Sequence, residues 1–149
     1  MASIWQCLVS SIGAMTAITA RPLSDSTDSL LRFAMRADAT LCAALGLLVA
    51  MAADPLSKLS GLSPAAEWAT GAGLVAYGAL LYMLAAVGDI RRVGIGVVAA
   101  NVAFVAAVVT VLAAGWLPLT ALGVVMTLAI AAATLAFAYL QYLGVRRLA

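Results

Sequence analysis

Residues 93–114 read VGIGVVAANVAFVAAVVTVLAA, and no side chain in this stretch carries a charge. A helix of this length rises about 33 Å at 1.5 Å per residue, which matches the bilayer hydrocarbon core of about 30 Å. Further apolar runs lie at 30–53, 64–87 and 119–143. The sequence therefore predicts an all-α, polytopic membrane four-helix bundle that occupies residues 30–149.

The composition excludes an ordinary soluble domain. Hydrophobic residues make up 66% of the chain and charged residues 9%, against about 25% charged in a typical soluble protein. The net charge of +2 is small, and its placement fits a membrane topology better than a phosphate-binding surface, so nucleic acid is not an expected partner. Abundant Ala, Val, Leu and Gly favour a bacterial origin.

The basic residues predict the orientation of the bundle, because short cytoplasmic loops carry an excess of Lys and Arg. With four spans, only Lys58 lies on the outer side. The chain is therefore expected in the inner (cytoplasmic) membrane as a multi-pass protein, with both termini in the cytoplasm. The basic residues on the inner side are Arg21, Arg32, Arg36, Arg91, Arg92, Arg146 and Arg147.

The N-terminal segment, residues 1–20, is uncharged, and its apolar residues recur at helical spacing. An amphipathic or loosely ordered segment at the membrane interface is the first expectation. A fifth span and a wrongly assigned start codon are the alternatives. Residues 21–29 are rich in turn-forming residues and predict a linker, at the end of which Asp28 or Ser29 caps the first span.

The connection between the first two spans contains several boundary signals. The dipeptide Asp54–Pro55 is expected to end the first span, because the residue before a proline avoids the α conformation. A loop should follow as far as Ser63, which is placed to cap the second span. Glu67 then lies in the first turn, where the helix dipole favours an acidic side chain.

Two polar residues inside the spans are the strongest pointers to a site, since such groups are costly in lipid. Asp38 and Asn101 lie about 22 Å and about 20 Å from the outer ends of their spans, so they share one depth. They are expected to form an intramembrane polar cluster with Arg32 and Arg36. The cluster could bind a headgroup, pass a proton or hold a substrate. Alternatively, it is a structural clamp, or Asp38 reaches the interface.

No catalytic constellation is present in the sequence. The chain contains no histidine, which removes His-based catalysis and His-ligated haem or zinc. It also has no phosphate-binding loop after a strand and no metal-spaced group of Cys or carboxylates. We therefore predict no catalytic residue, no cofactor and no metal, and a protein that is not an enzyme.

Three stretches resemble a family of small bacterial four-span integral membrane proteins that has no assigned function. They are LLRFAMRADATLCAALGLL (30–48), DPLSKLSGLSP (54–64) and VVAANVAFVAAVV (97–109). The resemblance covers most of the chain from residue 30 onward. It implies a four-span fold, and it implies that the arginines of the first helix, Asp38 and Asn101 belong together.

Three functions remain open. The first is a non-enzymatic accessory or structural bundle surrounded by membrane lipids, in which small residues four apart, such as Gly46 and Ala50, favour close helix contacts with itself or with a membrane protein partner. The second is a small oligomeric transporter or proton-coupled carrier that uses Asp38 and Asn101. The third is a membrane enzyme, or a binder of lipid or quinone at the inner leaflet, with a pocket that holds Arg32, Arg36 and Asp38.

Overall fold

The computed structural model describes residues 28–148, and every regular element in that range is a helix. The all-α class is therefore confirmed. The expectations for residues 1–20 and for most of the linker at 21–29 lie outside the described residues. The helices are α3 (Ser29–Met51), α4 (Ala53–Ser60), α5 (Pro64–Leu84), α6 (Ile90–Ala114) and α7 (Ala121–Arg146).

Three helices, α3, α6 and α7, are long and apolar enough to cross a membrane. The helix at the predicted second span, α5, is not among them. Large apolar side chains cover the outside of the molecule, and Met51, Trp116 and Phe33 are 85%, 72% and 69% exposed. Such a surface is a liability in water and the normal state in lipid. The fold thus supports a membrane protein.

Side chains fix the starts of several helices. The Ser63 hydroxyl accepts a hydrogen bond from the N–H of Ala66 at 3.2 Å, which confirms the predicted cap of α5. Asp89 caps α6 in the same way, with a distance of 3.4 Å to the backbone N–H three residues later. Asp28 occupies the N-cap position of α3, but its carboxylate does not make the expected cap hydrogen bond and pairs with Arg32 at 2.9 Å.

The connection after the first span differs from the predicted loop. α3 ends at Met51, but Asp54 does not avoid the helical conformation as predicted, because residues 53–60 form a second, short helix. Pro55 occupies its first turn, where a missing N–H costs nothing, and Asp54 there complements the helix dipole. Gly61 ends α4 with φ of 89°, a conformation that glycine adopts without strain.

α3 and α5 pack backbone against backbone through small residues. A Cβ placed on Gly71 would lie 2.5 Å from the backbone oxygen of Gly46 and 2.5 Å from the backbone nitrogen of Ala50. A Cβ on Gly78 would lie 2.6 Å from the carbonyl oxygen of Ala39. Close approach of this kind replaces the hydrophobic effect as the source of helix association in lipid, because it maximises dispersion contacts.

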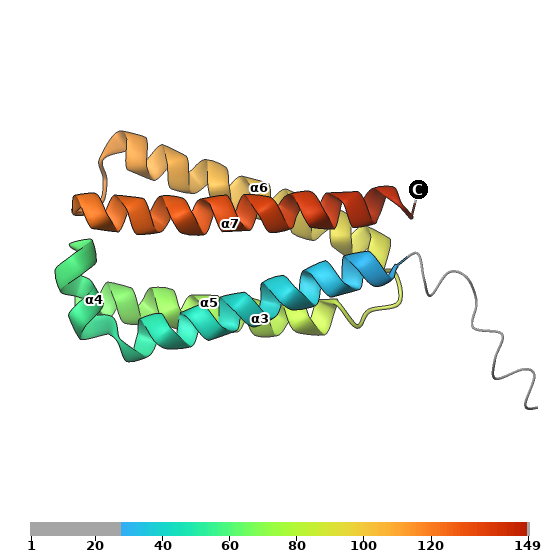
Figure 1. Ribbon diagram of the computed structural model, residues 1–149, viewed down its shortest axis with the longest axis horizontal. Coiled ribbons are helices and arrows are strands. Elements are labelled where there is room, and N and C mark those ends of the chain that lie inside the picture. The colour runs from blue at the N-terminus through green and yellow to red at the C-terminus, as the bar shows by residue number, and fades with distance from the viewer. Residues whose placement is uncertain (1–27, 149) are drawn as a thin grey trace, which may run out of the picture.

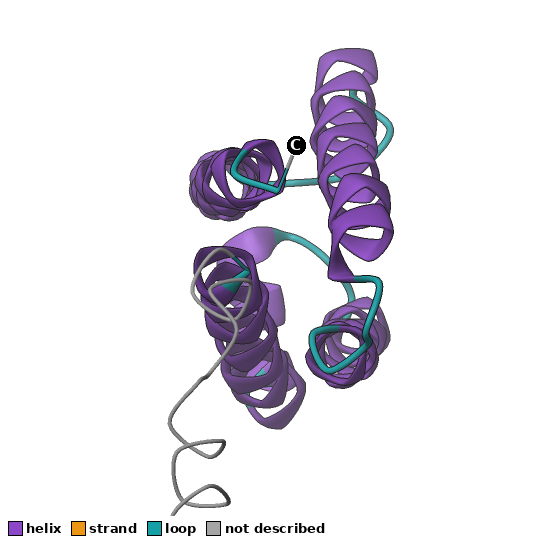
Figure 2. Cartoon of the chain, turned by 90° about the vertical axis from the view of Figure 1, so that its right-hand side faces the viewer, coloured by secondary structure: helices purple, strands orange, loops and turns teal. Residues whose placement is uncertain are grey.

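The long helices are arranged as two pairs, α3 with α5 and α6 with α7 (Figures 1 and 2). The pairs meet mainly through α3 and α7, and α4 contacts both α5 and α7 at the opposite end of the molecule from the C-terminus. Leu31, which is fully buried, holds the pairs together where α3 begins. Its side chain packs on Gly94 of α6, and Gly144 of α7 packs against the same residue.

Candidate functional site

A buried polar cluster joins all four long helices. It consists of Asp38 on α3, Tyr77 on α5, Asn101 on α6 and Gln141 on α7, and we call these four residues the polar cluster. The Gln141 amide donates to Asp38 Oδ2 at 2.8 Å, and the Asn101 amide donates to the same oxygen at 3.4 Å. Asn101 Nδ2 also lies 3.0 Å from Gln141 Oε1, and the Tyr77 hydroxyl donates to Asn101 Oδ1 at 2.7 Å.

The members of the cluster satisfy one another. Asp38, Asn101 and Gln141 are only 4%, 3% and 0% exposed. Within residues 28–148, no buried side-chain nitrogen or oxygen lacks a hydrogen-bond partner. The second carboxylate oxygen of Asp38 faces the thiol of Cys42 at 3.5 Å. Since an unpaired polar group in an apolar core costs several kcal/mol, complete pairing is what makes this cluster tolerable.

Asp38 has no ionic partner among the described residues. The ion pairs of this part of the chain join Arg32 to Asp28 and Arg92 to Asp89. Neutral donors alone therefore surround the Asp38 carboxyl group: two carboxamides and one thiol. Asp38 is also the sole acidic residue within α3, α6 and α7.

The structure brings two of the four predicted site residues together and leaves the other two apart. Asp38 and Asn101 are in contact, as their shared depth predicted. Arg32 instead donates to the backbone oxygens of Ala85 at 2.8 Å and Val87 at 3.1 Å. It thereby caps the carbonyl end of α5, which favours a cation there. Arg36 is exposed on another face of α3 and forms no ion pair within the described chain.

Sequence reasoning missed Gln141 altogether and did not place Tyr77 in the cluster. A signal for Gln141 exists in the sequence. The buried residues of α7 include Ala131, Ala138, Gln141 and Val145, which recur at helical spacing. A single carboxamide within such an apolar stripe needs a partner on another helix, because lipid offers none.

A second polar contact lies at the far end of the bundle. The Ser60 hydroxyl, at the end of α4, donates to the carboxylate of Glu67, which is 7% exposed. The backbone of Thr120, just before α7, donates to the carbonyl oxygen of Ser60 at 2.8 Å, and the Thr120 hydroxyl donates to that of Leu59. Glu67 is therefore more than a favourable first-turn residue, since it anchors α4 to α5.

Chemically, the polar cluster can fix the helices relative to one another, bind a proton or bind a small polar group. In residues 28–148 no three side chains of the Cys, His, Asp or Glu type are grouped to hold a metal ion. A scan against protein-family models gives no match, and neither curated proteins nor solved structures yield one. The resemblance to the four-span family therefore stays an expectation, and the case for a function depends on this geometry.

Proposed function

We propose that the chain is a non-enzymatic integral membrane protein, an accessory or structural bundle of four transmembrane helices in a bacterial cytoplasmic membrane. The observation that carries this proposal is the closed hydrogen bonding of the polar cluster. Each carboxamide there donates to another member of the cluster, and none of its four residues lines the two open grooves along α3. A cluster of this kind fixes helix register rather than turning over a substrate.

The path of the chain supports a fourth span. α3 and α6 both begin at the same end of the molecule, where Leu31 and Gly94 touch. α5 must therefore carry the chain back from the α4 end. Its 21 residues rise about 31 Å, enough to cross the hydrocarbon core. If α3, α6 and α7 are in the membrane, α5 crosses it with them.

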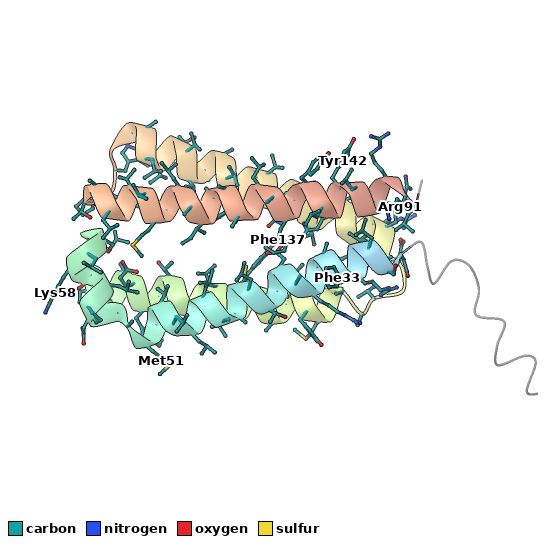
Figure 3. All side chains as sticks on the ribbon, in the orientation of Figure 1. Phe33, Met51, Lys58, Arg91, Phe137 and Tyr142 are labelled. Atoms are coloured by element: carbon teal, nitrogen blue, oxygen red, sulfur yellow. The ribbon has the colours of Figure 1, made fainter. Side chains whose placement is uncertain are left out.

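The distribution of charge supports the proposed orientation. Lys58 lies at the α4 end, and Arg91 lies at the opposite end (Figure 3). The arginines at the start of α3 and at the end of α7 share the Arg91 end, because those helix termini pack together. By the positive-inside rule, basic residues gathered at one end support the proposed cytoplasmic location of that end.

A double-mutant cycle between Tyr77 and Asn101 tests the structural role. Asn101→Ala should cost about 1–3 kcal/mol of unfolding free energy, because it leaves the Tyr77 hydroxyl and the Gln141 carbonyl without partners. Tyr77→Phe should cost about 1 kcal/mol. The double variant should be no less stable than Asn101→Ala alone, since both substitutions remove the same bond. The measurement is unfolding in detergent micelles.

Tyr82→Phe is the matched control for the cycle, because Tyr82 is on the same helix and 55% exposed. It should leave stability unchanged. If Asn101→Ala unfolds at the same point as the parent protein, the cluster does not hold the fold together, and the structural proposal fails.

A second candidate function is a small oligomeric, proton-coupled carrier. Its supporting observation is Asp38, a buried carboxyl group with no cation beside it in the described chain. Acidic residues in this setting recur in proton relays of membrane transporters. Asp38 would carry the proton, and the amides of Asn101 and Gln141 would hold its carboxyl group in place through two hydrogen bonds.

Proton flux into proteoliposomes separates the two candidates. Asp38→Asn keeps an acceptor for the Gln141 amide, so it should fold and reach the membrane at the parental level. If the carrier function is real, this variant loses a pH-driven flux that the parent protein shows. Asp54→Asn, at an exposed position on α4, is the control and should retain it. No flux from the parent protein would eliminate the carrier and leave the structural bundle.

A further inference from the structure

An apolar groove runs along the outward face of α3, and one charged residue lies in its wall. The groove is open to the surroundings of the molecule and has a volume of about 650 Å³. Phe33 and Arg36 of α3 line it, with Tyr82 of α5 and Phe137 of α7 on its flanks. Figure 3 labels Phe137 between α7 and α3, and Phe33 nearer the beginning of α3.

A second groove continues the first along the seam between α3 and α5. It has a volume of about 600 Å³, shares Thr40, Ala44 and Tyr82 with the first, and extends to Leu47. The distance along α3 from Phe33 to Leu47 is about 21 Å. One leaflet of the hydrocarbon core is about 15 Å deep, half of the bilayer value. The two grooves together are therefore long enough for one lipid acyl chain.

Arg36 supplies the polar end of this path. It lies about 10 Å along α3 from Ser29, a distance that a long arginine side chain can span to reach the headgroups. Its guanidinium forms neither an ion pair nor a side-chain hydrogen bond within the described chain. The acids nearest in sequence, Asp28 and Asp38, are engaged by Arg32 and by the polar cluster. A cation without a counter-ion beside an apolar groove is suited to bind an anion that carries a hydrophobic tail.

We propose that this groove binds one anionic phospholipid, with its phosphate on Arg36 and one acyl chain along α3. A guanidinium matches a phosphate with two parallel N–H donors, which a zwitterionic lipid occupies less favourably because its own cation competes. The half-exposed Tyr82 places an aromatic ring and a phenol at the rim, the position that such residues take near headgroups. The lipid comes from the leaflet next to the start of α3, which is cytoplasmic in the proposed orientation.

Native mass spectrometry of the full chain in detergent tests whether the charge of Arg36 selects an anionic lipid. The probes are phosphatidylglycerol and phosphatidylcholine with identical acyl chains. The parent protein should retain one phosphatidylglycerol in preference to phosphatidylcholine. Arg36→Gln should weaken phosphatidylglycerol binding about tenfold, or about 1.4 kcal/mol, and leave phosphatidylcholine binding unchanged. Arg91→Gln removes another exposed arginine at the same end of the bundle, outside the groove, and should change binding less than about twofold.

Equal retention of the two lipids by the parent protein would overturn the proposal. Equal losses of phosphatidylglycerol binding in the Arg36 and Arg91 variants would also overturn it, because the effect would then come from general surface charge. Ala44→Trp tests the acyl chain, because it fills the groove without altering charge. It should weaken binding of both lipids, and undiminished binding would place the chain elsewhere. This inference requires only that α3 crosses the membrane, so it stands or falls independently of the polar cluster.

Discussion

Gly71→Ala is expected to cost about 2–3 kcal/mol of unfolding free energy and to separate α3 from α5. The added methyl group would lie 2.5 Å from the oxygen of Gly46 and 2.5 Å from the nitrogen of Ala50. All the nearest atoms belong to the backbone of α3, so no side chain can rotate away and the helices must move apart. Every small-residue contact along the seam would weaken with them.

Gly73→Ala is the matched control on the same helix. A Cβ there would meet nothing within 4 Å, and Gly73 is exposed. Alanine is also the better helix former by up to about 1 kcal/mol, so this variant should be as stable as the parent protein or more so. Unfolding of both variants in detergent supplies the comparison. Equal stability of the Gly71 variant would show that α3 and α5 do not approach as closely as described.

The second large effect is expected at Gln141, the fully buried member of the polar cluster. Gln141→Leu has a similar volume but removes the 2.8 Å donor to Asp38 and the acceptor for the Asn101 amide. Asp38 would keep only its longer contacts of 3.4 Å and 3.5 Å, to Asn101 and Cys42. The expected cost is about 3 kcal/mol, because a buried carboxyl group loses its closest partner.

Thr134→Val controls for the loss of polarity on α7. The Thr134 hydroxyl bonds back to the carbonyl oxygen of Ile130 at 3.0 Å, on its own helix, so its removal should cost less than about 1 kcal/mol. Asp38→Asn in the Gln141→Leu background should recover part of the lost stability, since it removes the acid that has lost its donor. Without such recovery, the cost of Gln141→Leu would come from packing rather than from Asp38.

Much of this fold follows from one-dimensional properties of the chain. Apolar length predicts the long helices to within a few residues at each end, because the bilayer core fixes how many residues must be apolar. Depth within a span predicted the contact between Asp38 and Asn101, since rise per residue converts position directly into height. The Ser63 cap was predictable for a similar reason, because it depends on neighbours in sequence.

Other features depend on rotation about helix axes and on partners far away in sequence. Arg32 was expected in the polar cluster, but its side chain contacts the end of α5, a contact between residues 53 positions apart. The helix α4 was predicted as loop because Asp54–Pro55 is compatible with both a helix end and a helix start. The contacts of α4 with Glu67 and Thr120 stabilise the short helix, so Asp54–Pro55 begins a helix here. No local pattern contains that information.

The span of 103 residues between Asp38 and Gln141 also bears on biogenesis. Chains grow by about 5–20 residues per second, so α3 is made about 5–20 s before its closest hydrogen-bond donor on α7. During that interval Asp38 lacks this donor, and an acid inside the hydrocarbon core is costly, by up to about 3 kcal/mol at the bilayer centre on insertion scales. A chain interrupted before α7 keeps this defect permanently. α7 thus completes the bonding of α3, and a chain that lacks α7 differs from the finished one by a buried acid without its closest donor.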